Sequence, residues 1–165
     1  MKLLLLVLTA FSLYIEATIF NSKAIVHPEV GKNGMVVSQH YLATNAGHSI
    51  LAEGGNAYDA SIAVAFALAV VLPRAGNIGG GGFMVMFDEA SQKSYSIDYR
   101  EIAPEAATKN MFLAADGSVD KKIATQGVLS IGVPGTVYGM WEVHKKFGSL
   151  PWSELLAPAI ELAED

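Results

Sequence analysis

The stretch Pro73-Arg74-Ala75-Gly76-Asn77-Ile78-Gly79-Gly80-Gly81-Gly82-Phe83 decides how this sequence folds, because it joins an apolar helical run to a β-type run. The residues before it, Ala60 to Leu72, are apolar almost all round, and a helix of that kind must be buried. This run is shorter than the ~20 residues of a membrane-spanning helix and stops at a proline, which favours a central core helix. After the glycines, Phe83 to Phe87 and Tyr95 to Tyr99 are separated by polar residues, a pattern that predicts an antiparallel hairpin.

Helical signals precede this core helix. Thr44 to Glu53 is alanine-rich with apolar residues at helical spacing, and Gly54-Gly55 provides the left-handed residue that ends a helix. Asn56 then caps the apolar helix, and the helix dipole favours Asp59 in its first turn. Together with the hairpin, these helices make the expected fold class α+β.

Other segments complete the expected secondary structure. They are a buried strand over Gly34 to Gln39, a loop and helix over Ala103 to Ala115, and helices over Val137 to Phe147 and over Trp152 to Glu164. Gly148 ends the first of these last two helices, and Ser153 caps the second.

The four consecutive glycines do not form a phosphate-binding loop. A dinucleotide fingerprint needs a strand before it and a helix after it, whereas here a helix precedes and a strand follows. A phosphate loop also needs Lys-Ser or Lys-Thr after its last glycine, and Phe83-Met84 stands there instead. We therefore expect Gly79 to Gly82 to permit unusual backbone angles and close approach of the central helix or a neighbouring segment.

The amino end has the layout of a secretory signal. Lys2 is followed by the apolar run Leu3 to Leu13, and Ile15-Glu16-Ala17 offers a cleavage site. The run is too short for a stable membrane anchor. We expect a signal peptide over residues 1–17, a linker over 18–33 and one domain over 34–165, in a secreted or periplasmic protein.

Composition excludes several classes of protein. The absence of cysteine from all 165 residues rules out a disulfide framework and thiolate metal sites. A net charge of −5 argues against a nucleic-acid partner, which requires basic patches. The four histidines form no close pair with metal-ligand spacing, so we expect no metal site and no cofactor.

Arg100, at the end of the second predicted strand, is the candidate binding residue. Its guanidinium offers a planar fork that meets a carboxylate with two parallel hydrogen bonds. The alternative is an ordinary surface arginine in an ion pair. Asp98 and Glu101 flank it, and local pairing or substrate binding explains these carboxylates better than the acid and base of a glycosidase.

Four motifs together resemble the large subunit of the γ-glutamyltranspeptidase family, in the same order along the chain. They are Glu53-Gly54-Gly55-Asn56-Ala57-Tyr58-Asp59-Ala60, Ala75 to Phe83, Asp98-Tyr99-Arg100-Glu101 with Ala103-Pro104, and Val133-Pro134-Gly135-Thr136. The resemblance implies part of an N-terminal nucleophile hydrolase, an αββα sandwich that is incomplete in this chain.

The resemblance also implies a reaction. A precursor cleaves itself to expose a threonine, which takes a γ-glutamyl group from glutathione or a related amide and passes it to water, an amino acid or a peptide. In this scheme Arg100 orients the α-carboxylate of the donor, and Glu101 helps to hold the arginine or the donor amine. The partners it implies are the rest of the large subunit and the small subunit.

No residue of this chain matches the family's nucleophile, which lies in a Thr-Thr-His-type motif beyond Asp165. The threonines here are all isolated: Thr9, Thr18, Thr44, Thr108, Thr125 and Thr136. We therefore assign no catalytic residue and expect the chain alone to be inactive. Two hypotheses follow: a segment that works within a larger enzyme, and a truncated non-catalytic product that binds small carboxylates or a partner subunit.

Overall fold

The computed structural model describes residues 29–164. The chain divides into two units, Met1–Lys32 and Asn33–Asp165, and every element below belongs to the second unit. The predicted signal peptide, residues 1–17, and most of the predicted linker lie outside the described residues. None of the described helices is long and apolar enough to cross a membrane.

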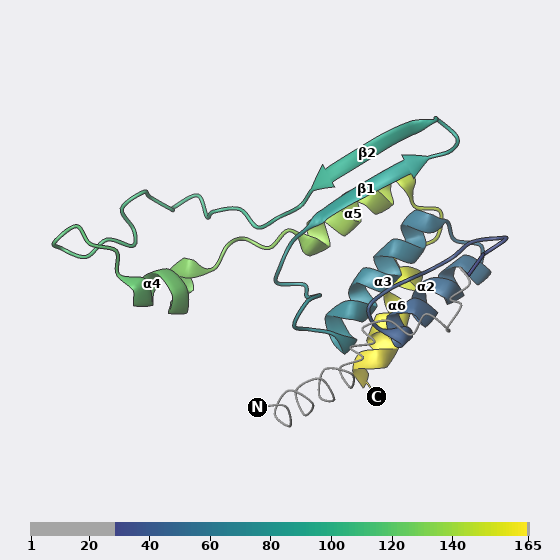
Figure 1. The fold of residues 1–165 in the computed structure, drawn as a ribbon, viewed down its shortest axis with the longest axis horizontal. Helices are drawn as coiled ribbons and strands as arrows, with labels where there is room; N and C mark the ends of the chain where they lie inside the picture. Colours follow the sequence, from purple (N-terminus) through teal and green to yellow (C-terminus); the bar gives the residue numbers. More distant parts are fainter. Residues whose placement is uncertain (1–28, 165) are drawn as a thin grey trace, which may run out of the picture. The chain divides into compact units, whose positions relative to one another are not determined.

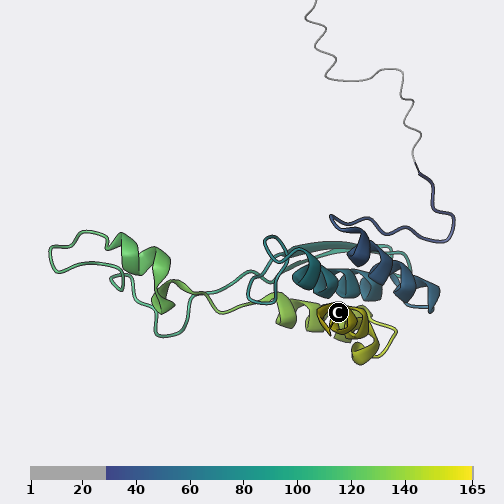
Figure 2. The same cartoon turned by 90° about the horizontal axis from the view of Figure 1, so that it is seen from below.

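The second unit combines helices with one two-stranded sheet (Figure 1). In chain order the elements are α2 (Tyr41–Ala52), α3 (Ala57–Val71), β1 (Phe83–Asp88), β2 (Lys93–Asp98), α4 (Lys121–Gln126), the 3₁₀ turn η1 (Val128–Ser130), α5 (Thr136–Phe147) and α6 (Trp152–Glu164). Figure 2 shows the longer helices in two rows, with α2 and α3 in one and α5 and α6 in the other.

Helix α3 is the central helix, as the sequence predicts. It buries Ala60, Ile62, Ala63, Phe66 and Ala67, and it packs against α2, α5 and α6. The largest core cluster joins it to Met86 of the hairpin, Met140 and Val143 of α5, and Leu155 and Ala159 of α6. The helix ends at Val71, with Leu72 as its C-cap just before Pro73.

A polar cluster around the buried Asp59 fixes the start of α3. Asn56 and Asp59 form a reciprocal capping box, in which each side chain accepts from the backbone of the other. Asp59 is completely buried and also accepts hydrogen bonds from the backbone N–H and the hydroxyl of Ser149. The amide of Asn56 donates to the carbonyl of Phe147 over 2.7 Å. The cluster therefore holds the α5–α6 connection against α3.

The predicted hairpin is confirmed, and its register defines two faces. Met84 pairs with Ile97 and Met86 with Tyr95, and these side chains pack toward the core. Because side chains alternate along a strand, the other face carries Phe83, Val85 and Phe87, which are exposed. In Figure 1 the hairpin runs along α5.

Between β2 and α5 the chain makes a long excursion. It leaves and returns through an antiparallel bridge between Ile102 and Val133, and a second bridge joins Leu113 to Val119. The helix predicted within Ala103 to Ala115 is absent, since that segment consists of turns and a bridge. The helix of this excursion is α4 instead, capped by the side chain of Asp120.

Two other local predictions are wrong. Gly34 to Gln39 forms no strand. Within the described part of the chain, the hydrogen-bonded sheet contains β1 and β2 alone, so this β-rich run has no neighbouring strand to pair with. Ser153 lies inside α6 rather than at its cap, because the helix already begins at Trp152.

Candidate functional site

Backbone hydrogen bonds fix the segment that follows β2. The N–H of Tyr99 donates to the carbonyl of Gly82 over 2.9 Å. Ile102 and Val133 exchange hydrogen bonds in both directions, at 3.2 and 2.8 Å. The glycine-rich loop is in turn tied to the start of α5, because the N–H groups of Gly135 and Thr136 both donate to the carbonyl of Gly80. Three pieces of chain thus meet around Arg100.

Glycines allow this close meeting. A Cβ at Gly81 would lie 2.5 Å from the carbonyl oxygen of Tyr99 and 2.6 Å from the Cα of Arg100. A Cβ at Gly135 would collide with the same Tyr99 carbonyl, and one at Gly139 with the ring of Tyr99. The backbone of Tyr99 and Arg100 therefore occupies the space that side chains at Gly81 and Gly135 would need.

The expectation for the glycine-rich loop is confirmed in one part and wrong in the other. Close approach to a neighbouring segment is real, and that segment is Tyr99–Arg100. Gly76 also approaches the central helix, at 3.0 Å between its added Cβ and that of Leu68. Unusual backbone angles are absent, because none of Gly79 to Gly82 has a positive φ.

Tyr99 is the partly buried member of this segment. Its ring packs against the core cluster and lies beside Gly139. Burial raises the pKa of the Tyr99 hydroxyl, so the group is protonated at neutral pH. It donates a long hydrogen bond, 3.5 Å, to the carbonyl of Phe83. Tyr99, the partly buried residue next to Arg100, thus links β1 to the end of β2.

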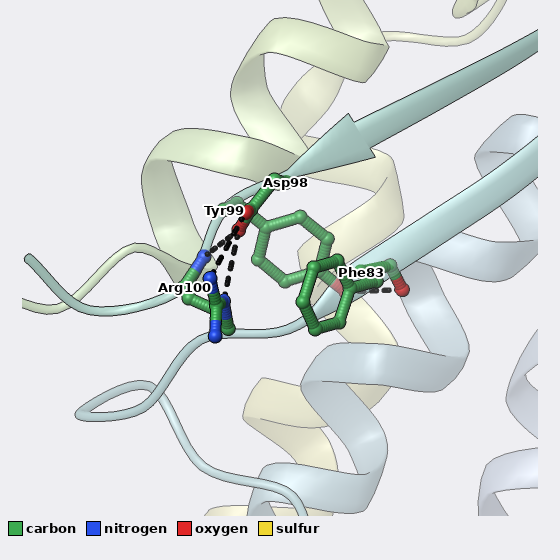
Figure 3. A network of polar contacts seen from close by, with 4 residues as sticks. All are labelled: Phe83, Asp98, Tyr99 and Arg100. Carbon is green, nitrogen blue, oxygen red and sulfur yellow. Dashed lines mark hydrogen bonds and ion pairs between the residues drawn. The ribbon is translucent and has the colours of Figure 1, made fainter.

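The side chain of Arg100 projects from the exposed face of the hairpin (Figure 3). It is 62% exposed and forms an ion pair with Asp98. Two parallel contacts join the groups, from Nε to Oδ1 and from Nη2 to Oδ2, both at 3.4 Å. The backbone N–H of Arg100 also donates to Asp98, over 3.0 Å. On the other side, the guanidinium carbon lies 4.9 Å from the centre of the Phe83 ring.

This arrangement leaves one edge of the guanidinium available. Arginine has five N–H donors, and Asp98 engages the Nε–H and one N–H of Nη2. The remaining donors belong to Nη1 and Nη2, which together form the fork that binds a carboxylate with two hydrogen bonds. Arg100 can therefore bind an anion without releasing Asp98.

Asp98 is ionised at neutral pH. The backbone N–H of Arg100, and then its side chain, hold the pKa of this carboxyl below the ordinary value of 3.8. The local pairing that the sequence suggests for Asp98 is confirmed.

Glu101 has different surroundings from Arg100. Within residues 29–164 no hydrogen bond or ion pair connects Glu101 to the arginine. Its carboxylate lies beside Gly80, at a cavity of about 250 Å³ that Asn77, Tyr99 and Thr136 also line. The structure thus places the two predicted binding residues next to each other in the chain but in separate environments.

Phe83 is the residue of this site that the sequence reasoning missed. The signal is the hairpin register, because Phe83 pairs with Asp98. The register puts Phe83 and Asp98 on one side of the hairpin. Arg100, two residues beyond the end of β2, lies on the same side, over the Phe83 ring.

A family model, curated relatives and solved structures all place this chain among the γ-glutamyltranspeptidases and glutathione hydrolases. The model of the gamma-glutamyltranspeptidase family matches residues 43–165. The glutathione hydrolase proenzyme of Pseudomonas aeruginosa is 51% identical over 131 residues, which is 79% of this chain and 23% of that protein. The glutathione hydrolase proenzyme of Escherichia coli is 45% identical over 141 residues, 86% of this chain and 24% of that protein.

Solved structures agree with the sequence matches. The γ-glutamyltranspeptidase of Helicobacter pylori has a TM-score of 0.78 and 50% identity, over 83% of this chain and 39% of that one. The cephalosporin acylase of Bacillus halodurans has a TM-score of 0.72 and 34% identity, over 88% of this chain and 27% of that one.

These matches define first a class and then a family. The described helices and hairpin are part of the α+β fold of the N-terminal nucleophile hydrolases. Within that class, the chain belongs to the γ-glutamyltranspeptidase family. It spans about a quarter of the length of the two curated relatives described above.

Proposed function

We propose that this chain works as part of an enzyme that transfers or hydrolyses γ-glutamyl groups, and that Arg100 binds the α-carboxylate of the donor. The donor is glutathione or a related γ-glutamyl amide, and the acceptor is water, an amino acid or a peptide. The chain contributes the arginine but no nucleophile. Its partners in the complete enzyme are the remaining large-subunit segment and the small subunit, in a secreted or periplasmic protein.

One observation supports the role of Arg100 above the others. The backbone of Arg100 is held by close glycine contacts, while its guanidinium keeps a free pair of N–H donors on an exposed face. A fixed backbone with an available fork is what orientation of a carboxylate requires, because a small misplacement of the substrate is costly for catalysis. An ordinary surface arginine needs neither feature.

The substrate-binding role of Glu101 stays a prediction. Its carboxylate could neutralise the ammonium group of the donor, but it faces the cavity beside Gly80 and not the fork of Arg100. Replacement by glutamine keeps the shape and removes the charge. We expect Glu101→Gln to weaken a donor that carries the ammonium group and to spare an analogue without it.

The test uses a chimeric proenzyme, in which the matched part of this chain replaces the corresponding segment of the Pseudomonas aeruginosa relative. We expect the chimera to process itself and to cleave a γ-glutamyl chromogenic amide. Arg100→Lys keeps the charge but loses the fork. Loss of a charge-assisted hydrogen bond, about 1.5 to 3 kcal/mol, corresponds to roughly ten- to a hundredfold in kcat/KM for the donor.

Processing separates a binding role from a structural one. Self-cleavage does not involve the carboxylate of the donor, so Arg100→Lys should still release the small subunit. Unchanged donor kinetics in the processed variant would remove Arg100 from the site. Failure to process would show that the arginine acts in folding. A processed parent chimera without γ-glutamyl activity would refute the proposed function as a whole.

A further inference from the structure

The ring of Phe83 lies against the guanidinium of Arg100, and nothing in the proposed function explains it. The distance from the guanidinium carbon to the ring centre is 4.9 Å, within the range of a cation–π interaction. Phe83 is 63% exposed, so the core of the described residues does not account for a large aromatic side chain here. Figure 3 shows this ring and Asp98 beside the same guanidinium.

The position of Phe83 is itself well determined. It is the first residue of β1, directly after the four glycines, and it pairs with Asp98 across the hairpin. Its carbonyl accepts the hydroxyl of Tyr99. The backbones of Phe83 and Arg100 are therefore fixed relative to each other by the hairpin and by the contacts of the glycine-rich loop.

We propose that Phe83 is a positioning residue for Arg100, which orients the guanidinium fork for the donor carboxylate. This inference rests on the proposed function of Arg100. Asp98 fixes one edge of the guanidinium and the ring of Phe83 restrains one face, so the free N–H pair of Nη1 and Nη2 points in a defined direction. An arginine side chain has many rotamers, and restraint before binding lowers the entropy cost of holding the substrate.

The chain supplies its own matched control for this role. Phe87 lies on the same exposed face of the same strand, four residues further on, and is 55% exposed. Within the described residues no arginine or lysine lies over its ring. The same substitution at both positions therefore separates an effect on Arg100 from a general effect of removing an aromatic ring from this face.

The experiment measures donor kinetics in the chimeric proenzyme with Phe83→Leu, Phe83→Tyr and Phe87→Leu. An exposed cation–π interaction corresponds to about a two- to fivefold effect. We expect Phe83→Leu to raise the donor KM by that factor while kcat stays within about twofold. Phe83→Tyr keeps the aromatic face and should match the parent, and Phe87→Leu should do the same. If Phe83→Leu does not process, Phe83→Met takes its place.

A double-substitution cycle shows whether Phe83 acts through the arginine. In the Arg100→Gln background no cation remains, so Phe83→Leu should cause no further loss of kcat/KM. An equal loss in both backgrounds, an equal loss in Phe87→Leu, or parental kinetics in Phe83→Leu would each overturn the proposal. The single variant Arg100→Gln tests the proposed function separately, because parental kinetics there would refute the role of Arg100 whatever Phe83 does.

Discussion

Asp59 and Asp98 each accept hydrogen bonds from three donor groups, but they differ in burial. Asp59 is completely buried and accepts from the backbone of Asn56 and from the backbone and hydroxyl of Ser149. Asp98 accepts from the backbone and two side-chain nitrogens of Arg100, and its side chain is 54% exposed. The carboxylate of Asp59 connects the start of α3 to Ser149, far along the chain. The carboxylate of Asp98 contacts Arg100, two residues away.

Burial determines what each carboxylate contributes to the protein. Loss of Asp59 leaves partly buried donors without their buried acceptor, and an unpaired donor of this kind costs free energy. Loss of Asp98 exposes its donors to water, which replaces most of the interaction. We therefore expect Asp59 to determine stability, and Asp98 to affect the direction of the Arg100 fork with little effect on stability.

The largest expected effect is that of Asp59→Ala. The partly buried backbone N–H groups of Ser149 and Asn56 lose the buried carboxylate that accepts from them, so we expect a loss of about 3 kcal/mol in the free energy of unfolding. In the chimeric proenzyme, the measurements are soluble yield and the midpoint of thermal inactivation at one heating rate.

Asp116 provides the exposed counterpart for that measurement. It accepts hydrogen bonds from the backbone and hydroxyl of Ser118, as Asp59 does from Ser149, but in an exposed turn. We expect Asp116→Ala to leave yield and midpoint near the parent values. Equal destabilisation by the two variants would contradict the division between buried and exposed carboxylates.

The next largest effect is expected where the backbone of Gly81 packs against Tyr99 and Arg100. A Cβ at Gly81 would meet the Tyr99 carbonyl, whereas one at Gly79 would have only Asn77 within contact, at 3.6 Å. Overpacking of this kind costs about 1 to 3 kcal/mol. We expect Gly81→Ala to lower both stability and donor kcat/KM, and Gly79→Ala to change neither. Equal tolerance of both alanines would show that the close approach does not position Arg100.

The smallest effect is that of Asp98→Asn. Because the pKa of Asp98 is lowered in the folded protein, its pairing with Arg100 is fully present above the unfolded value near 3.8 and is lost as pH falls through the lower folded value. The ratio of donor KM between variant and parent should therefore be constant from about pH 6 to about pH 9. We expect that ratio to be roughly two- to threefold, as befits an exposed pair.

Kinetics across that range check this last point. A variant-to-parent ratio that changes between neutral and alkaline pH would mean that a group other than Asp98 titrates at the site.

Local chemistry made much of the fold predictable. Neighbouring residues determine the start, the body and the end of α3: the cap at Asn56, the apolar run and the stop at Pro73. All three predictions are confirmed. The hairpin is also local, because its strands are separated only by a short polar turn. Motifs in a fixed order identified the family, and the comparisons confirm it.

Features that depend on distant partners could not be predicted in this way. The β-rich run at Gly34 to Gln39 has the composition of a strand, but a strand exists only when another strand pairs with it. The partner of Asp59 is Ser149, far along the chain, and no spacing rule connects them. The glycines predicted close approach of the central helix or a neighbouring segment but did not identify Tyr99 and Arg100, since that contact arises only when the hairpin has folded.

The most direct test of carboxylate binding by Arg100 removes the α-carboxylate from the substrate and the guanidinium from the protein. The parent chimera and Arg100→Lys are compared on a γ-glutamyl amide and on the 4-aminobutyryl amide, which lacks only the α-carboxylate. If Arg100 binds the α-carboxylate, the substitution lowers kcat/KM roughly ten- to a hundredfold for the first donor and by less than about twofold for the second. The same loss for both donors would contradict this role, because Arg100 would then act on something other than the carboxylate.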